Sequence, residues 1–167
     1  MIISDNFSLP FLSETNVQNV AAVLAGLAET GDVIALSGDL GAGKTVFAKA
    51  FVRALTNEAE DVPSPTFTLV QTYDGRRGKD SLSVWHFDLY RLKSAEEIYE
   101  TGFEEALSDG VSLIEWPERA GNLLPKNRLT VHLEAPAGQP DKRNVMITAN
   151  GADWIQRMEK MKACLNV

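Results

Sequence analysis

The sequence predicts an α/β fold, a three-layer sandwich whose mixed sheet has a parallel core and antiparallel additions. Three observations predict it. Residues 32–55 read as an apolar strand, a glycine-rich turn and a helix. Two pairs of strand-like runs are joined by short connections, and further segments have helical spacing. At 167 residues and 44 % hydrophobic, with no dividing linker, the chain suits one domain over 1–167.

The first half of the chain supplies the predicted central unit. Ser13 can cap a helix that ends before Gly31. Residues 32–37 then form a short strand and residues 44–55 a second helix, followed by a polar, proline-bearing connection at 57–65. The apolar face of the first helix is Val17, Val20, Val23, Leu24 and Leu27.

Two strand-like runs follow, at 66–73 and 82–89. The connection between them is too short for a crossover helix, so we expect antiparallel neighbours. Its basic residues Arg76, Arg77 and Lys79 are expected at a solvated hairpin tip, with a contact to a partner or RNA as the alternative.

The second half of the chain again predicts both helices and strands. Ser94 and Glu97 form a capping-box pattern that opens an acidic helix running to about residue 109. An apolar strand at 111–116 is stopped by a proline. The remaining runs predict a second strand pair, at 129–134 and 144–148, and a terminal helix at 153–165.

Residues 38–45 read Gly-Asp-Leu-Gly-Ala-Gly-Lys-Thr, a complete G-x-x-x-x-G-K-[ST] phosphate-binding loop. Gly38 and the other glycines let backbone N–H groups turn inward around a phosphate. Lys44 supplies positive charge for the β- and γ-phosphates, and the Thr45 hydroxyl is placed to bind Mg²⁺. A strand before the loop and a helix after it are the context that the motif requires. The predicted fold is therefore P-loop NTPase-like.

Nucleotide turnover also needs a carboxylate near Mg²⁺ and a group that orients the attacking atom. Two apolar runs end in an acid, Asp88 and Glu115, and each could lie at the carboxyl edge of the sheet. The alternative for each is a capping or ion-paired surface carboxylate, and we expect at least one to touch the metal. Pro65 presents the hydroxyls of Ser64 and Thr66 from extended backbone, as a switch-like loop or as an ordinary strand entry.

Other signals narrow the class of protein. The net charge of −7 argues against autonomous nucleic-acid binding. The base-reading motif of GTP-binding proteins, Asn/Thr-Lys-x-Asp, is absent from the sequence, which favours ATP. A secretory leader pattern and a bilayer-length apolar run are also absent, and the single cysteine, Cys164, has no internal partner, so we expect a cytoplasmic protein without membrane association. Trp116 either packs in the core or offers a stacking surface, and His86 is expected to be structural.

Four segments in this order resemble the bacterial TsaE (YjeE) family of small ATPases required to make threonylcarbamoyladenosine in tRNA: residues 38–45, 64–70, 86–92 and 113–118. The resemblance covers nearly the whole chain and is less distinctive after about residue 121. It implies ATP hydrolysis that is weak alone and stimulated by a TsaB–TsaD heterodimer, which the hydrolysis resets between turnovers. It implies contact with tRNA only through that complex.

The resemblance also implies roles for individual residues. Thr45 and Glu115 would bind Mg²⁺, Asp88 would act near the metal or the attacking water, and Thr15 would lie near the nucleotide base. Ser64 and Thr66 would belong to the switch-like loop and Trp116 to a segment needed for activity. The implied phosphate-binding residues are Asp39, Leu40, Gly41, Ala42, Gly43, Lys44 and Thr45.

Two other functions remain open from the residues alone. In a small-molecule or nucleoside kinase of the P-loop class, Arg76, Arg77 or Arg91 would clamp the transferred phosphoryl group. In a non-catalytic nucleotide-sensing scaffold, Lys44 would be needed for assembly, whereas Asp88 and Glu115 would be dispensable.

Overall fold

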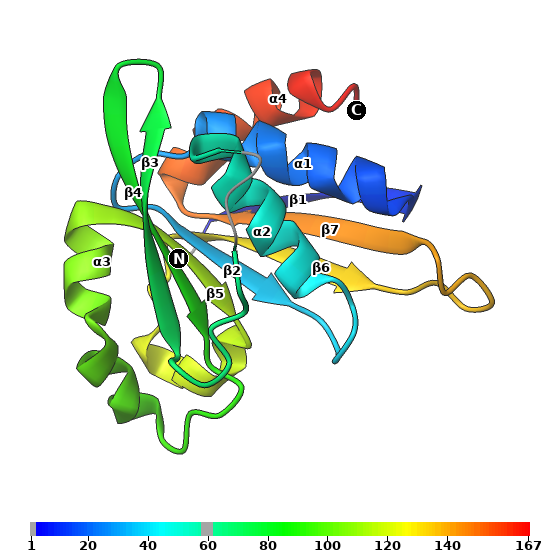
Figure 1. Ribbon diagram of the computed structural model, residues 1–167. Helices are drawn as coiled ribbons and strands as arrows, with labels where there is room; N and C mark the ends of the chain where they lie inside the picture. Colours follow the sequence, from blue (N-terminus) through cyan, green and yellow to red (C-terminus); the bar gives the residue numbers. More distant parts are fainter. Residues whose placement is uncertain (1–2, 58–61) are drawn as a thin grey trace.

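The computed structural model describes residues 3–57 and 62–167, and these residues form a seven-stranded sheet with helices on both faces (Figure 1). The strand order is β1-β7-β6-β2-β5-β4-β3. In chain order the elements are β1 Ser4–Leu12, α1 Glu14–Leu27, β2 Val33–Ser37, α2 Lys44–Leu55, β3 Val70–Arg77, β4 Asp80–Asp88, the 3₁₀ helix η1 Ala95–Thr101, α3 Phe103–Asp109, β5 Gly110–Glu115, the 3₁₀ helix η2 Pro117–Leu123, β6 Arg128–Glu134, β7 Arg143–Asn150 and α4 Ala152–Cys164.

The predicted mixed sheet is confirmed. Its centre is parallel, because β2 pairs in parallel with both β5 and β6, and β4 pairs in parallel with β5. Its additions are antiparallel: β3 pairs with β4, β6 with β7, and β7 with β1. Both predicted strand pairs are therefore antiparallel neighbours, as their short connections required.

Two hydrophobic cores lie on opposite faces of this sheet. Helices α1, α2 and α4 cover one face, and η1, α3 and η2 cover the other (Figure 1). Strand β2 is buried on both sides: Ile34 and Leu36 belong to the first core, Val33 and Ala35 to the second. This burial explains why β2 reads as a continuous apolar run. Within the described part of the chain, no helix has the length and apolar character needed to cross a membrane.

Several boundaries differ from the sequence-based expectation, and both strands of the β3–β4 hairpin extend further toward its tip than expected. The strand expected at 66–73 begins only at Val70, because residues 66–69 form a turn in which the Leu69 N–H donates to the Pro65 carbonyl at 2.8 Å. The acidic helix is divided at Gly102, whose φ of +85° ends η1. Strand β5 stops at Glu115, before Trp116. Part of the expected connection at 57–65 lies outside the described residues.

Strand β1 was not predicted. It is an edge strand in which Phe7 is the buried residue and most other side chains are exposed, so it has little of the period-two hydrophobic pattern that identifies strands. The α1 helix, by contrast, begins where expected: the Ser13 hydroxyl accepts a hydrogen bond from the Asn16 N–H at 3.2 Å.

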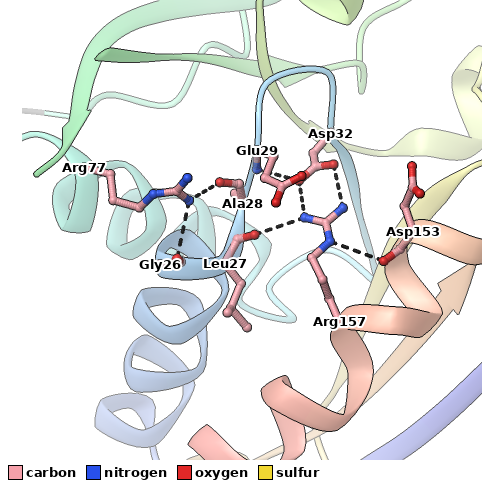
Figure 2. Close-up of polar contacts among 8 residues, drawn as sticks. All are labelled: Gly26, Leu27, Ala28, Glu29, Asp32, Arg77, Asp153 and Arg157. Carbon is pink, nitrogen blue, oxygen red and sulfur yellow. Dashed lines mark hydrogen bonds and ion pairs between the residues drawn. The ribbon is translucent and has the colours of Figure 1, made fainter. Parts of the chain in front are cut away.

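Two arginines bind the carboxyl end of α1 (Figure 2). Arg157 of α4 makes a two-point contact with Asp32, at 2.6 and 2.8 Å, and donates to the Leu27 carbonyl at 3.0 Å. Arg77 of the β3–β4 hairpin donates to the Ala28 carbonyl and, at 3.3 Å, to that of Gly26. Helix ends leave such carbonyls without partners inside the helix. The expectation of a solvated tip is therefore wrong for Arg77, which holds the hairpin against α1.

Candidate nucleotide and magnesium site

The sheet brings the predicted site residues to one edge. Strands β2, β5 and β4 are parallel, so their carboxyl ends meet there. The register places Asp88 of β4 opposite Glu115 of β5, and Glu115 opposite Leu36 of β2, just before the glycine-rich loop. A cavity of about 370 Å³ opens at this edge, and its lining residues are Leu40, Gly41, Ala42, Gly43, Lys44, Thr45, Val46, Ser64, Thr66, Asp88, Tyr90, Arg91, Glu115 and Trp116.

The loop backbone depends on its glycines. Gly38, Gly41 and Gly43 have φ values of +142°, +81° and +105°, which L side chains rarely adopt. A Cβ atom on Gly38 would also clash with the backbone carbonyl of Leu133 in β6. The loop therefore lies directly against the end of β6, and glycine is required there for two separate reasons.

Lys44 is the first residue of α2 and is only 4 % exposed. Its Nζ donates to the Gly38 and Asp39 carbonyls at 2.5 and 2.8 Å and lies 3.9 Å from the centre of the Trp116 ring. Burial lowers the pKa of Lys44 below its usual range, and four nearby carboxylates oppose that shift: Glu115, Glu118, Asp88 and Asp39. Two carbonyl oxygens and the face of the Trp116 ring thus hold the Lys44 ammonium against the loop.

Glu115 joins the loop to the interior of the sheet. Its Oε1 accepts a hydrogen bond from the Thr45 hydroxyl at 2.8 Å, and its Oε2 lies 2.6 Å from Nε2 of the fully buried His86. Among the described residues the other ring nitrogen, Nδ1, has no hydrogen-bond partner. This pattern assigns the ring proton to Nε2, which donates to Glu115. His86 is therefore a structural histidine, as expected, and its hydrogen bond orients the Glu115 carboxylate.

Asp88 holds the two predicted hydroxyl residues. Its Oδ2 accepts hydrogen bonds from Thr66 at 3.1 Å and Ser64 at 3.4 Å, and its Oδ1 accepts one from the Tyr90 N–H at 3.1 Å. The two hydroxyls also contact each other at 2.9 Å. The segment at 64–66 thus lies beside Asp88, and both hydroxyl residues line the cavity.

Trp116 lines the cavity and is half-buried. Its φ of +58° places it in the left-handed region, and its ring contacts both the Lys44 ammonium and the Tyr90 ring, whose centre is 5.0 Å away. Arg91 also lines the cavity and lies over the ring of the exposed Phe67 at 4.5 Å. Of the arginines suggested for a kinase clamp, Arg91 alone lines this cavity, whereas Arg77 binds the end of α1.

A second pocket of about 330 Å³ adjoins the loop and shares Gly43 and Val46 with the first cavity. Its other lining residues are Glu14, Val17, Pro140, Asp141 and Arg143. Thr15 is exposed in the first turn of α1, next to Glu14. Sequence reasoning missed Tyr90 and Arg143. Tyr90 lay inside a segment used for the family resemblance, but no motif surrounds Arg143.

Mg²⁺ prefers hard oxygen ligands and is bound in proteins by one or two carboxylates together with substrate phosphates and water. The Thr45 hydroxyl and the Glu115 carboxylate offer such oxygens 2.8 Å apart at the mouth of the loop. Over residues 3–57 and 62–167, no cluster of three or more His, Cys, Asp or Glu residues forms an all-protein metal cage. The residues present therefore fit a magnesium ion that is shared with a bound nucleotide.

Comparisons with known proteins identify a family for this chain. The family model described as "Threonylcarbamoyl adenosine biosynthesis protein TsaE" matches residues 11–145. Similar proteins named tRNA threonylcarbamoyladenosine biosynthesis protein TsaE include that of Rickettsia conorii, 45 % identical over 74 % of this chain and 68 % of the relative. Another is from Bacillus subtilis, 36 % identical over 89 % of both chains. The crystal structure of Bacillus subtilis YdiB superposes with a TM-score of 0.72 and 28 % identity, over 98 % of this chain and 97 % of that one.

Proposed function

The chain belongs to the TsaE family of threonylcarbamoyl adenosine biosynthesis proteins, and we propose that it serves tRNA modification as a magnesium-dependent ATPase. One observation carries the proposal. The phosphate loop, Lys44 and the Thr45–Glu115 pair all face one cavity, with a second carboxylate, Asp88, on the neighbouring strand.

The loop binds the polyphosphate of ATP or ADP. The predicted ligands are the backbone amides of residues 39–45 and the N-terminus of α2. The Lys44 ammonium exchanges its contacts with the Gly38 and Asp39 carbonyls for the β- and γ-phosphates. The nucleoside occupies the adjoining pocket, where Glu14 and Val17 lie beside Thr15, the residue that the family resemblance assigns to the base.

Thr45 and Glu115 hold Mg²⁺, and His86 fixes Glu115 from behind. When bound, the metal neutralises the charge that develops on the phosphate oxygens. Because Glu115 is 2 % exposed and bonded on both oxygens, its carboxylate is oriented before nucleotide arrives. Such preorganisation removes a reorganisation cost from the reaction.

Asp88 orients the attacking water. Its Oδ2 accepts hydrogen bonds from the hydroxyls of Ser64 and Thr66. A change in the position of either hydroxyl therefore changes the orientation of the Asp88 carboxylate, which faces the cavity. We assign this segment the role of sensing the γ-phosphate, as switch segments do in other nucleotide hydrolases. Trp116 closes the site over the lysine.

Hydrolysis is coupled to partner proteins. The resemblance assigns the chain to a TsaB–TsaD heterodimer, which it resets between rounds of threonylcarbamoyl transfer in the cytoplasm. The net charge of −7 supports a subunit that contacts tRNA only through that complex. Because the resemblance implies stimulation by that complex, hydrolysis of ATP by the chain alone is expected to be slow.

The test measures phosphate release from ATP by the chain, with and without a purified TsaB–TsaD pair. We expect Mg²⁺-dependent release that the pair stimulates and that Lys44→Ala abolishes. Equal release with and without the pair would refute the coupling. ATP-dependent phosphorylation of a nucleoside or metabolite would instead favour a kinase in which Arg91 acts on the transferred group.

A further inference from the structure

Arg143, the first residue of β7, extends its guanidinium to the phosphate loop. Its Nε donates to the Ala42 carbonyl at 2.8 Å and its Nη2 to the Gly41 carbonyl at 3.1 Å. Its Nη1 donates to the carbonyls of Pro140 at 2.7 Å and Lys142 at 2.6 Å. One half-buried side chain thus ties the loop to the connection between β6 and β7.

The order of the strands explains this reach. Strand β6 lies beside β2 and parallel to it, so the chain leaves β6 at the edge where β2 enters the loop. Strand β7 is antiparallel to β6 and therefore starts at that same edge. The close packing of Gly38 against the Leu133 carbonyl leaves the loop within range of a long side chain from β7.

These contacts fix the direction of the loop peptides. A trans peptide is planar, and its C=O and N–H groups point in opposite directions. Holding the Ala42 carbonyl toward Arg143 therefore sets the direction of the Gly43 N–H. Holding the Gly41 carbonyl sets that of the Ala42 N–H, which donates to the Asp39 carbonyl at 3.0 Å and closes the turn.

The glycines make such a restraint necessary. Gly41 and Gly43 have positive φ values and, without a Cβ, populate many other backbone conformations. We propose that Arg143 is a positioning residue for nucleotide binding, one that holds the Ala42–Gly43 peptide with its N–H toward the phosphate. This inference rests on the proposed function only in taking the loop as a nucleotide site.

The guanidinium also carries charge, so orientation must be separated from simple attraction of an anion. Lysine at 143 would keep the positive charge. Its single ammonium is a point charge on a flexible stem and does not reproduce the planar fork that spans the Gly41 and Ala42 carbonyls. If orientation is the role, Arg143→Lys should behave more like Arg143→Gln than like the parent protein.

Arg128 offers a matched control. It is the first residue of β6, is half-buried, and donates from Nη1 to the carbonyl of Pro125 at 2.8 Å. Arg143 makes the equivalent bond to Pro140, also three residues earlier. The two arginines differ in that only Arg143 bonds to Gly41 and Ala42 of the loop. Arg128 begins its strand at the opposite edge of the sheet, away from the loop.

The experiment compares Arg143→Gln, Arg143→Lys and Arg128→Gln by calorimetry with ADP in EDTA, so that the metal plays no part. Thermal unfolding and the exchange rate of the Ala42 amide, which is bonded to the Asp39 carbonyl, are measured on the nucleotide-free proteins. We expect Arg143→Gln to raise the Kd for ADP about tenfold, the effect of losing one or two charge-assisted hydrogen bonds. Arg143→Lys should recover less than half of the loss, and the Ala42 amide should exchange faster in both Arg143 variants. Arg128→Gln should bind ADP like the parent.

Two results would overturn the inference: an unchanged Kd in a folded Arg143→Gln protein, or full recovery by lysine, which would assign the effect to charge alone. If the glutamine variant does not fold, the ADP affinity of the lysine variant and the exchange rate of its Ala42 amide decide between the same outcomes. A parent protein that binds no ADP would refute the proposed function itself, a result readily told apart from loss confined to the Arg143 variants.

Discussion

Replacing Glu115 by glutamine separates the folding role of this residue from its role toward the metal. The carboxylate is 2 % exposed and bonded to Thr45 and His86. Glutamine can keep both partners: its carbonyl accepts from the His86 Nε2–H, and its amide donates to the Thr45 hydroxyl oxygen. The shape is preserved, and the charge is removed.

The effect on folding should be small. A hydrogen bond to a charged group contributes about 1.5–3 kcal/mol and a neutral one about 0.5–1.5 kcal/mol, so two bonds lose about 2–3 kcal/mol together. Removing a buried carboxylate also relieves a desolvation cost of several kcal/mol. The two terms offset each other, and we expect a free energy of unfolding within about 2 kcal/mol of the parent value.

The effect of Glu115→Gln on the affinity for Mg²⁺ should be large. Changing a residue that only supports a metal ligand costs about 10–100-fold in affinity, and loss of a ligand itself should cost at least the upper figure. We therefore expect Glu115→Gln to bind ADP in EDTA like the parent but to lose the tightening that Mg²⁺ produces. Calorimetry with and without Mg²⁺ and thermal unfolding measure the two effects separately.

Glu134→Gln is the matched control. Glu134 also ends a parallel strand beside a histidine, with His132 Nε2 3.9 Å away, but it is exposed. Its variant should keep the full Mg²⁺ effect. If folded Glu115→Gln keeps that effect as well, the assignment of Glu115 as a metal ligand is wrong.

Further substitutions test other parts of the structure. Lys44→Ala should weaken ADP binding at least tenfold, since it removes the point charge for the phosphates, and unchanged affinity in calorimetry would contradict the loop assignment. Asp88→Asn should lower the rate of ATP hydrolysis much more than it weakens ADP binding; equal losses in both would argue against a role toward the attacking water. Trp116→Phe should abolish most of the change in tryptophan fluorescence when ADP displaces Lys44 from the ring, and a signal that persists must come from another tryptophan. Asp32→Asn should cost about 2 kcal/mol, a fall of roughly 4–8 °C in melting temperature, with ADP affinity unchanged, because its bond to Arg157 lies at the opposite end of β2 from the loop (Figure 2).

Short sequence patterns predicted the elements whose structure depends only on neighbouring residues. The loop and α2 were placed to the residue because a strand, a glycine turn and a helix follow one another within one short segment. The cap at Ser13 was found for the same reason. The turn at 66–69 was missed because its β-branched and aromatic residues favour a strand, whereas a hydrogen bond to the Pro65 carbonyl closes a turn.

The composition of the site was predictable, but the pairing of its residues was not. Sequence marked Asp88 and Glu115 as strand ends without deciding which acid meets Thr45. That choice is made by the register of β4, β5 and β2, which depends on the packing of the whole sheet. The contact between Arg143 and Ala42 spans 101 positions in the chain and has no motif, so no local pattern could indicate it.

Asp88 lies directly opposite Glu115 on the neighbouring strand, so the pairing of the two strands sets the distance between their backbones, which is about 4.8 Å in β-sheets. Such a spacing is insensitive to the turns that surround it. Relatives or engineered forms can therefore lengthen, shorten or exchange those turns while the Cα atoms of the two acids keep their separation.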